Sequence, residues 1–153
     1  MRTLIVYHSE TGNTEKVAIA IAEVFNTIPV KIDNATNIGL GYDLIIVGTP
    51  VHGLKPNKKI LEFLEKIPQG SIKYGAAFCT MHLIGGNRTC ETISKKMKEK
   101  QIKYLDGFCC KAQSRLFGNF GPKIFNKGRP NENDLEGARE FAEIIRSEIE
   151  EQL

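Results

Sequence analysis

A group of hydroxyl and amide side chains stands near the N-terminus, between two elements of predictable type. The group consists of Ser9, Glu10, Thr11, Gly12, Asn13 and Thr14. It follows an apolar run at 3–7 and precedes a helical pattern that begins near Thr14. The start of a helix presents free N–H groups and a partial positive charge, which favour a phosphate. The spacing predicts a phosphate-binding loop, and a polar cap turn without a ligand stays the alternative.

The loop lacks the residues that phosphate transfer requires. It contains no Lys or Arg, whereas the loops of nucleoside triphosphatases need Gly-Lys-Ser/Thr to handle phosphate and Mg²⁺. A phosphoacceptor receiver domain needs acidic residues after the first and third strands, where this chain has His8-Ser9 and Thr49-Pro50. We therefore expect a loop that holds a phosphate monoester without moving it.

Short apolar runs alternate with helical patterns along the chain. We expect strands at 3–7, 29–33, 43–48, 74–79 and 104–111, and helices from about 14, at 60–67, at 92–101 and from a capping box at Asn133–Glu136. This order predicts a single α/β domain over residues 1–153, a doubly wound parallel sheet with helices on both faces. The segment 34–42 is short for a helical crossover. The segment 112–130 is expected to be a long, functional loop.

The first loop resembles the phosphate loop of the flavodoxins, which has the form Thr/Ser-x-Thr-Gly-Asn-Thr at the same strand–helix turn. The resemblance continues in order through Val47–Gly53, the loop after the fourth strand and the closing helix. It implies a flavodoxin-like five-stranded parallel sheet of order 2-1-3-4-5, with flavin mononucleotide (FMN) beside strands one and three. It also implies an FMN-binding electron-transfer protein, a low-potential electron carrier.

Two further loops are expected to enclose the flavin ring. The first contains Thr49, Pro50, Val51, His52 and Gly53, and the second contains Thr80, Met81, His82, Gly85, Gly86 and Asn87. The resemblance implies that a peptide near His52-Gly53 can turn its carbonyl toward flavin N5, a change that glycine permits with little penalty. In the second loop, Gly85 and Gly86 are expected to allow close backbone approach to the ring edge.

The expected ring walls differ from those of better-known flavodoxins, which usually stack Tyr or Trp on the flavin. This chain has no Trp, and neither loop contains Tyr. His52, Met81 and His82 are the expected substitutes, with Phe117 or Phe120 of the long loop as another source. The two histidines are also candidates for proton transfer. A more accessible ring keeps open an FMN-dependent NAD(P)H:quinone-type oxidoreductase, and a flavin-free phosphate-binding module is a third alternative.

Charge is concentrated in the middle of the chain. The whole chain has a net charge of +3, but residues 55–130 hold 16 basic and 5 acidic groups, a net charge of +11. Such a region suits redox partner proteins, a reductase or an acceptor, with an acidic docking face. The lysines between 95 and 103 are not interleaved with aromatic residues, so nucleic-acid binding is not expected. We expect a monomer or a weak homodimer.

The four cysteines are Cys79, Cys90, Cys109 and Cys110. They contain no Cys-x-x-Cys pair and no disulfide framework, so neither a metal site nor a disulfide is expected. Cys109 and Arg115 match a Cys-x5-Arg phosphatase loop, but the match straddles the end of an apolar strand and lacks glycine, so we interpret it as chance. With no apolar run of membrane-spanning length and no signal peptide, we expect a cytoplasmic chain without a membrane partner.

Overall fold

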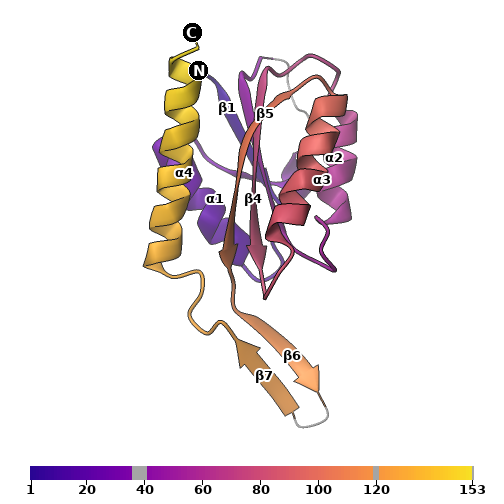
Figure 1. Ribbon diagram of the computed structural model, residues 1–153, viewed down its shortest axis with the longest axis vertical. Coiled ribbons are helices and arrows are strands. Elements are labelled where there is room, and N and C mark those ends of the chain that lie inside the picture. Colours follow the sequence, from indigo (N-terminus) through magenta and orange to yellow (C-terminus); the bar gives the residue numbers. More distant parts are fainter. Residues whose placement is uncertain (36–40, 119–120, 153) are drawn as a thin grey trace.

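A five-stranded parallel sheet forms the centre of the molecule (Figure 1). The computed structural model describes residues 1–35, 41–118 and 121–152, with no side-chain description at 115–122. The strands are β1 (Thr3–Tyr7), β2 (Val30–Lys31), β3 (Leu44–Pro50), β4 (Tyr74–Met81) and β5 (Lys103–Lys111). Their hydrogen-bonded order is β2-β1-β3-β4-β5, and every pair is parallel. The predicted fold class and strand order are confirmed.

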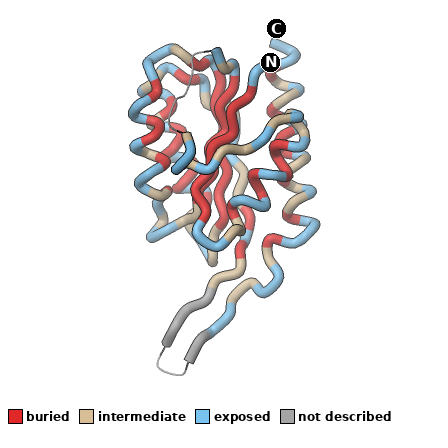
Figure 2. Tube along the Cα trace, turned by 180° about the vertical axis from the view of Figure 1, so that it is seen from behind, coloured by how far each residue is buried: buried red, intermediate tan, exposed pale blue. Residues whose placement is uncertain are grey.

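Helices cover both faces of this sheet. Figure 1 shows α1 (Asn13–Val24) and α4 (Glu132–Glu150) on one face, and α2 (Lys58–Lys66) and α3 (Gly86–Glu99) on the other. All five residues of β1 are buried, because a strand covered on both sides has no solvent-facing row. In Figure 2 the buried residues accordingly concentrate in the central strands and on the inner sides of the helices.

Each face has its own hydrophobic core, since consecutive strand residues point to opposite sides. Ile5 and Tyr7 belong to the core under α1 and α4, whereas Leu4 and Val6 belong to the core under α2 and α3. The predicted apolar face of the last helix is confirmed: Ala138, Phe141, Ala142, Ile145 and Ile149 are buried, and Leu135 packs against them.

Several predicted boundaries differ from the observed ones, and β3 and β4 each end two residues later than expected. The helix expected at 92–101 begins at Gly86, because the first turn of α3 is polar and glycine-containing and resembles a loop. The second strand ends at Lys31 and passes into a 3-10 turn, η1 (Ile32–Asn34). The capping box of α4 uses Asn131 and Asp134, two residues before the expected pair. Of the connection expected at 34–42, residues 36–40 lie outside the described part of the chain.

The long segment after β5 is not the structureless loop that the sequence predicts. It contains two antiparallel strands, β6 (Ser114–Gly118) and β7 (Gly121–Phe125). Figure 1 shows this hairpin projecting beyond the carboxyl ends of the sheet strands. The expectation failed because each strand is only five residues long and contains or adjoins glycine, which weakens a strand pattern.

Candidate functional site

The Ser9–Thr14 loop turns the chain from β1 into α1. Gly12 is the N-cap of α1 with φ +88°, a left-handed conformation that favours glycine, and no side chain caps the helix. The main-chain N–H of Gly12 donates to Ser9 Oγ at 3.1 Å, which closes the turn. By contrast, α2 and α4 are capped by the side chains of Asn57 and Asn131. The start of α1 therefore keeps the N–H groups of its first turn free for an anion.

Hydrogen bonds join this loop to two other segments at the carboxyl edge of the sheet. Thr14 Oγ1 lies 2.8 Å from Thr80 Oγ1 at the end of β4, and both side chains are buried. Asn13 Nδ2 donates to the carbonyl oxygen of Gln113 at 3.0 Å. The main-chain N–H of Val51 donates to the carbonyl oxygen of Thr80 at 2.9 Å. The three predicted loops are therefore brought together, because Thr80 of the third loop is hydrogen-bonded to each of the other two.

The loop after β3 closes in a tight turn. The main-chain N–H groups of His52 and Lys55 each donate to the other residue's carbonyl oxygen at 3.0 Å. Gly53 and Leu54 between them have φ +56° and +66°, the combination that defines a type I′ turn. His52 is exposed, and its Nε2 lies 3.3 Å from Glu10 Oε1 of the first loop. Leucine rarely adopts a positive φ, so this turn holds local backbone strain.

Thr49 and Pro50, expected at the ring, lie at the end of β3. The buried Thr49 hydroxyl accepts a hydrogen bond from the main-chain N–H of Asn57 and donates to the carbonyl oxygen of Pro50, both at 2.9 Å. Thr49 therefore fastens the start of α2 to the sheet, and its hydroxyl is already engaged within the protein.

The second predicted wall is shorter than expected, because Gly86 and Asn87 belong to α3. Gly85 is the N-cap of that helix with φ +102°, and a Cβ there would lie 2.8 Å from Leu54 Cδ2. A Cβ on Gly86 would lie 2.7 Å from Cys109 Sγ. Both glycines therefore allow close packing within the protein, of loop on loop and of helix on sheet.

A cavity of about 470 Å³ opens between the two loops. Its apolar lining comes from Leu54, Met81, Leu83 and Ile84. Leu83 and Ile84 are 59% and 71% exposed. Exposed apolar side chains that gather beside a cavity usually serve binding. Sequence reasoning proposed only Met81 among these four. Leu83 and Ile84 are adjacent apolar residues between polar and glycine residues, a signal that could have indicated them.

The residues that line this cavity do not include His82, which was a predicted wall of the ring site. Its Nδ1 is hydrogen-bonded to the Ser114 hydroxyl, and its ring meets Phe125 edge to face with the centroids 4.6 Å apart. Its carbonyl oxygen accepts a hydrogen bond from Asn126 Nδ2 at 2.6 Å. His82 therefore holds the base of the hairpin. The side chain of Phe117 and the whole of Phe120 lie outside the described residues.

Tyr7 and Asp134 lie near this edge and have altered pKa values. Burial, with a hydrogen bond of 2.6 Å to Glu15, raises the pKa of Tyr7 to about 12. Burial disfavours the charged form of Asp134, but hydrogen bonds from Arg129 and from the main chain of Asn131 outweigh it and lower the pKa of that carboxyl. Tyr7 thus stays protonated and Asp134 ionised at neutral pH, where both serve structural contacts.

The fold and this edge together define a doubly wound α/β protein with a candidate anion site where the strand order reverses. The flavodoxin domain family matches residues 4–116. An uncharacterized protein of Methanocaldococcus jannaschii is 35% identical over 150 residues, which cover 95% of this chain and 98% of that protein. This chain belongs to the flavodoxin family.

Solved structures of low sequence identity share the fold. A flavodoxin from the domain Archaea has a TM-score of 0.73 and 21% identity, with 98% of this chain and 99% of that chain covered. A flavoprotein from Lactobacillus acidophilus, solved in complex with FMN, has a TM-score of 0.59 and 20% identity, with 71% of this chain and 92% of that chain covered. Among the described helices, none has both the length and the apolar character needed to cross a membrane.

Proposed function

We propose that this chain binds FMN at the carboxyl edge of its sheet and works as an electron-transfer protein. The proposal rests chiefly on the start of α1, which no side chain caps and which lies in a loop of hydroxyl and amide groups. Membership of the flavodoxin family and the similar FMN-bound flavoprotein support the same ligand.

The donor set suits a phosphate monoester. Ser9, Thr11 and Thr14 offer hydroxyls, and the first turn of α1 offers main-chain N–H groups. The Asn13 amide donates to Thr11 Oγ1 and to the carbonyl oxygen of Gln113, so it braces the loop. A Cβ on Gly12 would meet no atom within 4 Å, so the space above the turn is open. The loop contains no cation, so these hydrogen bonds and the helix dipole would hold the phosphate.

The cavity beside Met81 suits the ring. Its aliphatic side chains from Leu54, Leu83 and Ile84 would exclude water from one side of a flat apolar group. When bound there, FMN would supply the redox chemistry, because its ring accepts and releases electrons. The protein's part is to position the ring, and the strained His52–Lys55 turn offers a main chain that can change conformation beside it.

A basic groove adjoins this edge and supports an acidic redox partner. The groove, of about 400 Å³ between α2 and α3, is lined by Lys55, Lys58, Arg88 and Lys95, with Glu91 as its acidic residue. Positive charge here would steer a reductase or acceptor with an acidic face toward the ring. The partner's association rate should therefore fall as salt is added.

A visible spectrum of the purified chain tests the proposal, followed by titration with FMN, with dithionite and with NAD(P)H. We expect a yellow protein, or uptake of one FMN per chain, and reduction by dithionite in two separable one-electron steps. A colourless protein that takes up no FMN would contradict the proposal and leave a flavin-free phosphate-binding module.

The exposed apolar edge at Leu83 and Ile84 favours one second candidate, an FMN-dependent NAD(P)H:quinone-type oxidoreductase. Such an enzyme needs its ring open to a flat apolar substrate. Rapid oxidation of NAD(P)H by the FMN-loaded protein, with turnover of a soluble quinone, would select this function. Absence of direct reaction would select the electron carrier.

A further inference from the structure

Three of the four cysteines meet on one side of the sheet. Cys79 of β4, Cys90 of α3 and Cys109 of β5 have Sγ atoms that all lie within 4.8 Å of one another. The Cys90 and Cys109 sulfurs are 3.5 Å apart. Cys79 and Cys90 are buried, and Cys109 is partly exposed. The spacing of the cysteines along the chain predicts no metal site, because it does not show that the fold brings Cys79, Cys90 and Cys109 together.

The fold places these thiols together for identifiable reasons. Cys79 and Cys109 pair directly across β4 and β5, so their side chains point to the same face. Helix α3 crosses that face and adds Cys90. Gly86 and Gly107 leave the room, since a Cβ on Gly86 would lie 2.7 Å from Cys109 Sγ and one on Gly107 would lie 3.0 Å from Cys90 Sγ.

Three sulfur ligands at this separation suit one soft metal ion. Zinc–thiolate bonds are about 2.3 Å long, so sulfurs around a single ion lie roughly 3.8 Å apart. That value falls between the 3.5 Å contact and the 4.8 Å limit of the cluster. Thiolates select Zn(II) and Cu(I) over ions that prefer oxygen, such as Mg²⁺ and Ca²⁺. We propose that Cys79, Cys90 and Cys109 bind one thiophilic metal ion of this class.

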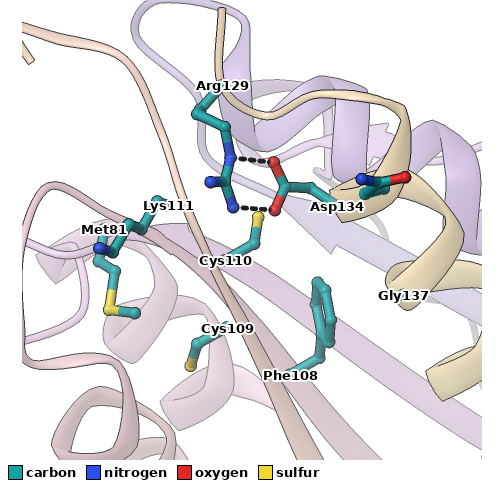
Figure 3. A pocket seen from close by; sticks show the side chains of 9 residues that line it. Met81, Phe108, Cys109, Cys110, Lys111, Arg129, Asp134 and Gly137 are labelled. Atoms are coloured by element: carbon teal, nitrogen blue, oxygen red, sulfur yellow. Dashed lines mark hydrogen bonds and ion pairs between the residues drawn. The ribbon is translucent and has the colours of Figure 1, made fainter. Parts of the chain in front are cut away.

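The cluster also has a partly exposed member, Cys109, and a candidate fourth ligand. Cys109 lines a cavity of about 430 Å³ together with Met81 (Figure 3). Met81 Sδ lies near Cys109 Sγ, because both are within 3.1 Å of the point where a Cβ on Gly86 would stand. A thioether is a soft ligand and keeps the preference for a thiophilic ion.

A disulfide or simple core packing would account for less of the arrangement. A disulfide between Cys90 and Cys109 would use only two of the three thiols and would need an oxidant. Cysteines that only fill the core need not come together from three elements. Cys110 is a buried cysteine that lies outside the cluster. Figure 3 shows Cys110 pointing to the other side of β5 from Cys109, toward Arg129 and Asp134. Cys110 is 6% exposed and is therefore a matched buried thiol outside the cluster.

Binding is a proton exchange without electron transfer. Each thiol that ligates the ion loses its proton to solvent, so a divalent ion bound by three thiolates releases up to three protons and leaves a net charge of −1. The three thiols lie outside the proposed flavin site, but Met81 adjoins both, so metal binding is measured with and without FMN.

The test uses the full chain, kept reduced with a phosphine, stripped of metal with a chelator and titrated with Cd(II) as the probe. We expect a sulfur-to-metal charge-transfer band that saturates at one Cd(II) per chain, and displacement of Cd(II) by Zn(II) in competition. Cys79→Ser, Cys90→Ser and Cys109→Ser should each weaken Cd(II) binding by more than about tenfold, since even loss of an outer-shell contact costs 10- to 100-fold. Cys110→Ser should leave the affinity unchanged.

If a serine variant does not fold, measurements on the unsubstituted chain still test whether three thiolates bind the metal ion. The intensity of the band reports how many thiolates bind the ion, and proton release in weak buffer gives a second value. Three thiolates support the site. Fewer than three, the absence of a band at one equivalent, or an equal loss of affinity in Cys110→Ser would overturn it.

Discussion

The hydrogen bond between Thr14 and Thr80 ties the phosphate loop to the end of β4, and its removal tests how the site is built. The two hydroxyl oxygens are 2.8 Å apart, and the residues are 2% and 4% exposed. Valine has nearly the shape of threonine, so Thr14→Val removes the hydroxyl without opening a cavity. Because water cannot replace the lost partner, the Thr80 hydroxyl is left unsatisfied.

The magnitude follows from that burial. An unsatisfied buried hydroxyl costs about 1–3 kcal/mol, so each single valine variant should lose about this much free energy of unfolding. The double variant Thr14→Val/Thr80→Val should lose less than the sum, because replacing both partners by apolar groups leaves nothing unsatisfied. FMN affinity should respond differently. If Thr14 also donates to the phosphate, Thr14→Val loses a hydrogen bond to a charged group, about 1.5–3 kcal/mol, which weakens binding roughly 10- to 150-fold.

Urea unfolding of the flavin-free chain measures the loss of unfolding free energy. Fluorescence titration with FMN and with riboflavin measures the change in flavin affinity. Riboflavin lacks the phosphate, so Thr14→Val should weaken FMN binding and leave riboflavin binding nearly unchanged. Thr80→Val should lower stability with a much smaller effect on FMN. As a control, Thr92→Val removes a hydroxyl whose hydrogen bond, within the described part of the chain, goes to the carbonyl oxygen of Arg88 in its own helix. Equal changes for FMN and riboflavin would refute the assignment of Thr14 to the phosphate.

Three further predictions concern separate parts of the structure. Gly53→Ala and its control Gly128→Ala place a side chain at φ +56° and +76°. Each variant should lose about 1 kcal/mol of unfolding free energy, measured in urea. Only Gly53→Ala should also shift the flavin reduction potential, measured by equilibration with a redox dye. An equal shift in both would contradict a role for the turn. Gly86→Ala overpacks the contact between α3 and β5 and should cost about 1–3 kcal/mol in thermal unfolding, whereas an unchanged melting temperature would contradict that packing. Asp134→Asn weakens the contact with Arg129 and should cost about 1–3 kcal/mol at pH 7. The pKa of Asp134 is lowered despite its burial, so its contribution to stability is complete above the unfolded-state pKa of about 4 and disappears as pH falls through the folded-state pKa. A stability difference between the unsubstituted chain and Asp134→Asn that stays constant down to acid pH would contradict the assignment.

The sheet could be predicted because its determinants are local. The runs at Thr3–Tyr7 and Leu44–Pro50 contain no charged residue, as is typical of strands covered on both faces. The proposed phosphate loop is also a local feature, because one glycine and a run of hydroxyls lie between a strand and a helix. Its cap geometry at Gly12 agrees with that reasoning.

The remaining features depend on contacts between distant residues. His82 was expected at the ring, but Ser114 and Asn126, 32 and 44 residues further on, hold it at the hairpin. Neither partner can be assigned before the hairpin itself is known. The three clustered cysteines are likewise separated by 11 and 19 residues, and they meet only through the register of Cys79 with Cys109 and the packing of α3 on that face.

The end of β4 connects the two proposed sites and offers a test of whether they are independent. Cys79 and Thr80 are adjacent, so their side chains point to opposite faces of the sheet, one toward α3 and the other toward Thr14 of α1. The three thiols thus share backbone but no side chain with the flavin site, and Met81 is the side chain that adjoins both. We expect Cys79→Ser to abolish tight Cd(II) binding and leave FMN affinity unchanged, and Thr80→Val to leave Cd(II) binding unchanged. Loss of FMN affinity in Cys79→Ser, with Cys110→Ser unaffected, would mean that a metal ion behind the sheet positions β4 for the flavin, and the two sites would then be one functional unit.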